Sequence, residues 1–152
     1  KESKKIHSNN IKLKFIGDTS LLTKALQIKI KEIEKETSRN KRLVLNVALN
    51  YGGRLDIVNS VNTFFNNKKK IKKITEKDIN SGLYTKGQSD VDLLIRTGGQ
   101  QRMSNFLLWQ SAYAELFFSK KLWPDFDEKI FVNALYFFQN TERKFGSVSK
   151  ST

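Results

Sequence analysis

Residues 91–118 read VDLLIRTGGQQRMSNFLLWQSAYAELFF, two apolar runs joined by a polar segment. The runs Val91–Ile95 and Glu115–Phe118 both predict buried strands. A Gly-Gly pair follows the first run, and Ser104 or the asparagine after it is placed to cap a helix that we expect to end near Tyr113. A strand–helix–strand unit of this kind joins two parallel strands, so this stretch predicts a parallel sheet.

The rest of the chain follows the same alternation. Lys12–Ile16 and Leu43–Ala48 predict two further strands, and the second is nearly continuously apolar, as is typical of parallel strands buried on both faces. We expect four more helices. The first is capped by Asp18 or Thr19, the second starts at about Asp56, and the last runs from Asp127 to Lys144. The third starts at Thr75 with a capping box. The predicted fold class is therefore α/β, a parallel sheet with alternating helices.

Length and composition exclude several classes of protein. The 152 residues suit one domain, and no apolar stretch approaches the roughly 20 residues of a membrane span. The chain has no cysteine and a single histidine, His7, which we expect at the surface. Disulfides, thiolate chemistry and cysteine- or histidine-rich metal sites are therefore excluded.

The chain is strongly basic, with 28 Lys and Arg against 15 Asp and Glu and a net charge of +13. Such a surface attracts phosphate groups of nucleic acids, lipids or small diphosphates. The run Lys68–Lys73 is expected to be a solvated basic segment. A basic nucleic-acid-binding domain is one hypothesis, but no recognisable binding motif accompanies the charge.

In parallel sheets, ligands bind beyond the carboxyl ends of the strands. That rule selects the turns at residues 17–19, 50–54 and 96–104. The last turn is the richest in chemistry, because Arg96, Arg102 and Ser104 surround the Gly-Gly pair and arginine forks match phosphate oxygens. Spacing alone leaves two interpretations open: an anion site, or a structural turn with solvated arginines. The turn at 50–54 is more often only structural.

Glu115 is the other candidate, because it is a carboxylate in an otherwise apolar run. It either faces water at the start of its strand or needs a partner such as a cation. From the residues alone, the first interpretation is favoured.

Residues 92–126, DLLIRTGGQQRMSNFLLWQSAYAELFFSKKLWPDF, resemble the signature region of the cis-prenyltransferase family, in particular its bacterial undecaprenyl diphosphate synthases. Further similar stretches occur in the family's order, so that the resemblance covers nearly the whole chain: IGDT at 16–19, LNVALNYGGRLD at 45–56 and ERKFG at 142–146.

The resemblance implies a parallel α/β fold with a hydrophobic tunnel, a homodimer and a Mg²⁺ cofactor. It implies the cis condensation of isopentenyl diphosphate onto an allylic diphosphate such as farnesyl diphosphate. The product would be a long-chain polyprenyl diphosphate such as undecaprenyl diphosphate, a lipid carrier for cell-wall synthesis. Arg96, Arg102 and Ser104 resemble the residues that hold isopentenyl diphosphate, and Glu115 resembles the acidic residue linked to Mg²⁺. The implied location is cytoplasmic with peripheral membrane contact, and nucleic acid is not an expected partner.

The sequence also departs from the family pattern. Gln100-Gln101 replaces the usual Glu-His, and Lys144 replaces the arginine of the C-terminal Arg-Phe-Gly motif. The family's Met-Asp-Gly-Asn-Gly-Arg-Trp-Ala segment, which carries the essential aspartate, does not occur in residues 1–152. We therefore expect residues 1–146 to be the C-terminal part of one cis-prenyltransferase domain, followed by a polar tail at 147–152, and expect it to be inactive alone. A non-catalytic partner subunit of the same fold is the alternative.

Overall fold

The computed structural model describes residues 6, 8–67 and 73–143. The chain divides into two compact units, residues 1–87 and 88–152, which are described separately below. The predictions for His7, for residues 68–72 of the basic run and for the polar tail at 147–152 lie outside the described residues, as does Lys144 at the expected end of the last helix.

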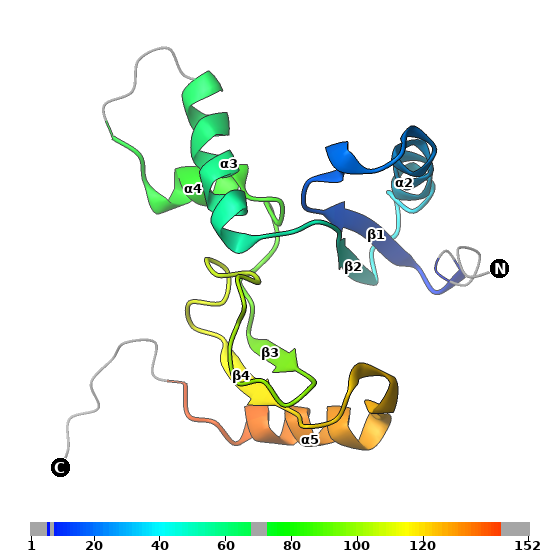
Figure 1. The fold of residues 1–152 in the computed structure, drawn as a ribbon, viewed down its shortest axis with the longest axis vertical. Coiled ribbons are helices and arrows are strands. Elements are labelled where there is room, and N and C mark those ends of the chain that lie inside the picture. Colours follow the sequence, from blue (N-terminus) through cyan, green and yellow to red (C-terminus); the bar gives the residue numbers. More distant parts are fainter. Residues whose placement is uncertain (1–5, 7, 68–72, 144–152) are drawn as a thin grey trace. The chain divides into compact units, whose positions relative to one another are not determined.

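The first unit contains a parallel pair of strands, β1 (Ile11–Ile16) and β2 (Leu43–Ala48), joined by helix α2 (Lys24–Glu36) (Figure 1). The register runs without interruption from the pair Ile11 and Leu43 to the pair Ile16 and Ala48. Asp18 caps a short 3-10 helix, Thr19–Leu21, rather than α2, whose cap is Thr23. The predicted strand–helix–strand unit is confirmed, with the helix starting one short turn later than expected.

Side chains of α2 and of the loop after it close the outer edge of β1. The Thr37 hydroxyl oxygen accepts from the Leu13 N–H at 3.1 Å, and the Glu34 carboxylate accepts from the Phe15 N–H at 2.8 Å. The Asn40 amide donates to the Ile11 carbonyl at 2.7 Å. These bonds satisfy backbone groups that an edge strand otherwise leaves open. Any further strand of this sheet must therefore pair with β2.

Strand β2 is more exposed than its composition predicts. Leu43, Val44 and Leu45 are 53%, 39% and 42% exposed, so the expectation of burial on both faces is wrong for this half of the strand. Helix α2 packs mainly against β1, whose Leu13 and Ile16 are buried. Apolar composition reports what a strand is able to bury, whereas burial itself depends on the elements that cover it.

Two helices complete the first unit: α3 (Gly53–Asn67) and α4 (Glu76–Gly82). Helix α3 begins three residues before the predicted start at Asp56, which lies in its first turn, where an acidic side chain is favourable. The predicted capping box of α4, Thr75 with Asp78, is present. The Ser60 hydroxyl donates to the Ile79 carbonyl at 2.5 Å and fastens the two helices together.

The second unit contains a second parallel pair, β3 (Leu93–Arg96) and β4 (Glu115–Phe118). A short 3-10 helix, Trp123–Asp125, follows and leads to α5 (Glu128–Gln139), which Asp127 caps. The α/β class and the parallel direction are confirmed. The strands of the described residues form two separate hydrogen-bonded pairs, β1 with β2 and β3 with β4. Helix α5 ends at Gln139, short of the predicted Lys144.

Gly17 supplies a test of the junction between β1 and β2. Its φ of 109° favours glycine, and a Cβ there would lie 2.2 Å from the Leu49 carbonyl oxygen. We expect Gly17→Ala to lower the free energy of unfolding by about 3 kcal/mol, since backbone strain and a backbone clash combine. Urea unfolding of the protein that contains this chain measures it.

Gly87→Ala is the matched control, because Gly87 has a φ of 77° and no atom within 4 Å of an added Cβ. It should cost only about 1 kcal/mol from strain. Equal losses in the two variants would contradict the packing account of Gly17.

Candidate functional site

A backbone frame holds the turn after β3 against the turn after β4. The Gly98 and Gly99 N–H groups donate to the Lys121 and Ser119 carbonyls at 2.7 and 2.9 Å. The Ser119 N–H donates to the Arg96 carbonyl at 2.8 Å. Gly98 and Gly99 have φ values of 87° and 77°, which explains the Gly-Gly pair in the sequence. The carboxyl end of this strand pair is thus a fixed platform.

The Arg96 side chain brings the three predicted site residues together. Its Nη1 atom donates to the Arg102 carbonyl oxygen and, at 2.7 Å, to the Ser104 hydroxyl oxygen. A single guanidinium at the end of β3 therefore holds the loop 97–104 folded back on its own strand. Arg96, Arg102 and Ser104 therefore lie together, Arg102 through its main-chain carbonyl, while their role in anion binding stays a prediction.

The predicted helix from Ser104 to Tyr113 is wrong. Ser104, Asn105 and Leu107 have φ values of 48°, 64° and 45°, which no right-handed helix allows, and the segment forms successive turns. The contacts of Ser104 with Arg96 outweigh the local helix preference. The positive potential here consequently comes from side chains and not from a helix N-terminus.

Two lysines that the sequence interpretation overlooked add to this potential. Lys120 and Lys121 follow β4, are exposed, and their backbone packs on the Gly-Gly turn. Together with Arg96 and the exposed Arg102, they place four cationic residues at the carboxyl end of β3 and β4. The sequence held a signal for them, because a pair of lysines shortly after a strand lies at the carboxyl end of a parallel sheet, where ligands bind.

Glu115 does not join this cluster in the structure. It is the first residue of β4 and pairs with Leu93, whereas Arg96 pairs with Phe118. Three residues of strand separate the two positions, or about 10 Å along the backbone. The Glu115 side chain is half-buried, and its N–H donates to the Asp92 carbonyl at 2.9 Å.

Arg143 lies at the same end of the strand pair as Glu115. Its Nη1 forms an ion pair with the Asp92 carboxylate at 2.6 Å, and its Nη2 donates to the Tyr113 carbonyl at 3.3 Å. The guanidinium carbon lies 5.3 Å from the centre of the Phe138 ring. The sequence showed Arg143 only as part of a family-like stretch and gave no sign of these contacts, of which the ion pair with Asp92 spans 51 residues of sequence.

In the first unit, the turns after β1 and β2 are tied to each other. The Asp18 N–H donates to the Asn50 carbonyl at 3.3 Å, and the Asn50 amide donates to the Asp18 carbonyl at 3.2 Å. Hydrogen bonds from the side chain and the backbone N–H of Ser20 lower the pKa of Asp18 below its ordinary value. A pocket of about 460 Å³ opens beside this turn, bordered by Asp18, Gln27, Lys31 and Tyr84.

Asp56 is buried at 1% exposure and fixes the turn that follows β2. Its carboxylate accepts from the Tyr51 hydroxyl at 2.9 Å and from the Tyr84 N–H at 3.0 Å. The interpretation of residues 50–54 as a structural turn agrees with this network.

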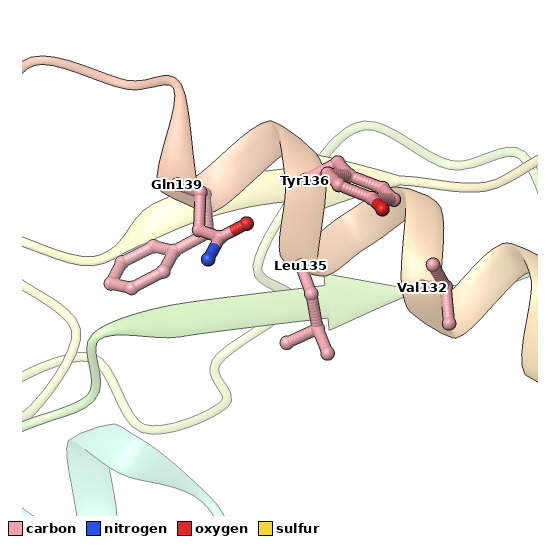
Figure 2. Close-up of a pocket in the computed structure, with 5 residues that line it drawn as sticks. Val132, Leu135, Tyr136 and Gln139 are labelled. Carbon is pink, nitrogen blue, oxygen red and sulfur yellow. The ribbon is translucent and has the colours of Figure 1, made fainter.

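Helix α5 carries an apolar pocket of about 490 Å³. Figure 2 shows Val132, Leu135, Tyr136 and Gln139 along this helix, and Phe138 completes the lining. Leu135 and Tyr136 are 40% and 61% exposed, so this face of α5 offers apolar surface to a ligand or a partner.

The described part of the chain contains no group of three acidic, histidine or cysteine residues that could hold a metal ion. No helix within it is long and apolar enough to cross a membrane. Gln100 and Gln101, which replace the family's Glu-His, are exposed in the turn beside Arg102.

Residues 1–146 match the prenyltransferase family model described as "Putative undecaprenyl diphosphate synthase". The chain belongs to this family. The match covers all of the first unit and the second unit up to residue 146.

Curated relatives support the assignment. The chain is 48% identical to a ditrans,polycis-undecaprenyl-diphosphate synthase ((2E,6E)-farnesyl-diphosphate specific) of Pasteurella multocida, over 98% of this chain and 64% of the relative. It is 45% identical to an isoprenyl transferase of Prochlorococcus marinus, over 97% of this chain and 56% of that relative. The chain thus spans less than two thirds of the length of these relatives.

Two solved structures share the fold. One is described as a probable undecaprenyl diphosphate synthase from Campylobacter jejuni, with a TM-score of 0.86 and 35% identity over 95% of this chain and 67% of that one. The other is lavandulyl diphosphate synthase from Lavandula x intermedia in complex with dimethylallyl diphosphate. Its TM-score is 0.88 and its identity 34%, over 95% of this chain and 64% of that one.

The Asp56 network gives a test of what fixes the turn after β2. Asp56→Ala leaves the Tyr51 hydroxyl and the Tyr84 N–H without their carboxylate acceptor. We expect a loss of about 3 kcal/mol in the free energy of unfolding, measured by urea titration of the full-length protein.

Asp90→Ala is the control, because Asp90 is exposed and should change that free energy by less than about 0.5 kcal/mol. Tyr51→Phe should lie between the two variants, at about 1 kcal/mol. A loss as small for Asp56→Ala as for Asp90→Ala would contradict this role.

Proposed function

We propose that the protein containing this chain is a cis-prenyltransferase that condenses isopentenyl diphosphate onto an allylic diphosphate, farnesyl diphosphate being the expected one. The product would be a long-chain polyprenyl diphosphate such as undecaprenyl diphosphate. The observation that carries the proposal is the clustering of Arg96, Arg102 and Ser104 on the backbone platform at the end of β3 and β4. The names of the similar proteins support it.

The cluster suits a diphosphate because it is cationic and fixed in place. Arg96 uses Nη1 to hold the loop, which leaves its other N–H groups for phosphate oxygens. The exposed Arg102 side chain adds a second planar fork, and Ser104 adds a hydroxyl donor. Lys120 and Lys121 raise the local positive potential, which speeds the arrival of an anionic substrate.

In the proposed reaction, the allylic carbon–oxygen bond breaks and diphosphate departs with its electron pair. The double bond of isopentenyl diphosphate attacks the allylic carbon and forms the new carbon–carbon bond. A proton is then lost from the resulting cation, and the new double bond is cis. The contribution of Arg96, Arg102 and Ser104 is to hold the nucleophilic double bond in position. We assign no allylic-diphosphate residue within residues 1–152.

Mg²⁺ would neutralise diphosphate charge when bound, and Glu115 is the residue of this chain that we propose to hold it. A half-buried carboxylate is the hard oxygen ligand that this ion prefers. The described residues contain no group of three acidic, histidine or cysteine residues around it, so most of the ligands would be water, phosphate oxygens and residues elsewhere.

A homodimer and peripheral membrane contact at the cytoplasmic face also belong to this proposal. The exposed apolar face of α5 supports this proposal, because a second subunit or an apolar product would cover it. The alternative, a non-catalytic partner subunit, is disfavoured because all three residues of the proposed diphosphate site are present. Gln100 and Gln101 are the departures that keep it worth testing.

The diphosphate site predicts a selective loss of affinity. In the full-length protein, Arg96→Ala or Arg102→Ala should weaken binding of isopentenyl diphosphate about ten- to a hundredfold, since each removes a charge-assisted contact. Binding of farnesyl diphosphate should change much less. Isothermal titration with each substrate separately measures both constants.

Arg39→Ala is the matched control, because it removes one exposed arginine from the first unit. Arg96→Lys should recover only part of the affinity, as an ammonium cannot hold the loop and two phosphate oxygens in one plane. Equal weakening by Arg39→Ala and Arg96→Ala would mean that overall basicity, and not this site, binds the substrate.

A further inference from the structure

The net charge of the chain belongs almost entirely to one of its two units. Residues 1–87 contain 20 Lys and Arg against 8 Asp and Glu, whereas residues 88–152 contain 8 against 7. The first unit therefore carries a charge of +12 and the second a charge of +1. An asymmetry of this kind between the halves of a chain points to a polyanionic partner of the basic half, such as a membrane surface or a nucleic acid.

Helix α2 presents part of this charge as one exposed stripe. Lys24, Ile28, Lys31 and Lys35 follow the spacing i, i+4, i+7 and i+11, which places them on one face of a helix. All four residues are exposed. Ile30, on the other side of the helix, is buried where α2 packs against β1. The stripe therefore faces away from the strand pair.

The three lysines of this stripe keep their charge available. Within the described residues, none of them has an acidic partner. Two glutamates of α2 are engaged elsewhere, because Glu32 pairs with Lys29 at 3.0 Å and Glu34 bonds to the edge of β1. The third, Glu36, lies off the stripe. An anionic partner would therefore meet lysines whose charge no carboxylate of the helix neutralises directly.

Exposed aliphatic side chains accompany these lysines and narrow the choice of partner. Ile28 is 59% exposed, and Leu21, three residues before Lys24, is 79% exposed. At a bilayer surface, such side chains enter the boundary of the acyl chains while lysines attract anionic headgroups. A nucleic acid gains little from them, and α2 has no aromatic ring on which a base could stack. Protein interfaces are depleted in lysine, so a protein partner fits less well.

We propose that the lysine stripe of α2, together with Leu21, binds the surface of an anionic lipid bilayer. The inference names the surface for the membrane contact that belongs to the proposed function, and it rests on that function for its purpose. A long polyprenyl chain is strongly apolar, so its transfer from the enzyme into lipid is favourable and its release into water is not. Docking of α2 on the bilayer keeps the enzyme beside the phase that takes up the product.

The test measures binding of the full-length protein to vesicles by sedimentation, without substrates. Vesicles of phosphatidylcholine and phosphatidylglycerol in equal parts should bind it, with an affinity that falls as salt is raised, and vesicles of phosphatidylcholine alone should not. Lys24→Ala, Lys31→Ala and Lys35→Ala combined should weaken binding about a hundredfold, since each lysine contributes about fivefold. Ile28→Ser should weaken it about tenfold, because the apolar side chain no longer enters the bilayer.

The matched control combines Lys73→Ala, Lys77→Ala and Lys86→Ala, which replace three exposed lysines of the same unit outside α2. It removes the same charge and should weaken vesicle binding by less than about tenfold. Equal weakening by the two triple variants would overturn the proposal, because overall basicity would then hold the vesicle. So would a lack of binding to the mixed vesicles, or an unchanged affinity in Ile28→Ser.

Single-stranded RNA provides the competing partner. Binding of RNA that the α2 triple variant abolishes, with vesicle binding unchanged, would assign the stripe to a nucleic acid and overturn the proposal. The α2 triple variant should fold, because alanine at exposed helix positions has the highest helix propensity.

Titration with isopentenyl diphosphate separates this inference from the proposed function. The α2 triple variant should bind isopentenyl diphosphate in solution as the unaltered protein does, because no residue of α2 belongs to the proposed diphosphate site. If vesicle binding fails while Arg96→Ala still loses affinity for isopentenyl diphosphate, only the docking surface fails. If Arg96→Ala keeps that affinity, the proposed diphosphate site fails, and vesicle binding still decides the role of the stripe.

Discussion

The hydrogen bonds of the Arg96 guanidinium to the Arg102 carbonyl and the Ser104 hydroxyl are the interaction on which the candidate site depends. They hold the loop 97–104 folded back over the end of β3. The backbone frame through Gly98, Gly99 and Ser119 supplies the rigid base. Binding groups that are fixed in advance lose less conformational entropy when a ligand arrives.

Two ends of one strand pair thus carry different chemistry. The carboxyl end collects cations, Arg96 and Arg102 with Lys120 and Lys121, and suits a diphosphate. The amino end carries the Arg143–Asp92 ion pair and Glu115, whose N–H donates to the Asp92 carbonyl. In the first unit, two sets of side-chain hydrogen bonds fix different parts of the strand pair. Buried Asp56 fixes the turn after β2, and side chains of α2 and its C-cap bond to the edge of β1.

The sequence predicted the strands well, because apolar runs bounded by turn residues are typical of strands. It also grouped Arg96, Arg102 and Ser104 correctly. The prediction of a helix at 104–113 was wrong, because the backbone there has positive φ values and Ser104 accepts a hydrogen bond from Arg96. The prediction of burial at Leu43–Leu45 was wrong, because burial depends on what covers the strand. The sequence could not predict that Arg143 pairs with Asp92, because an ion pair across 51 residues leaves no local pattern.

The central claim is that the Arg96-held loop is a preformed diphosphate site. Hydrogen–deuterium exchange of the full-length protein, titrated with inorganic diphosphate, tests it most directly. The account predicts saturable protection confined to residues 97–106 and 119–121, and its loss in Arg96→Ala. Protection spread evenly over the lysine-rich surface, or unchanged exchange at 97–106 when diphosphate is bound, would contradict it.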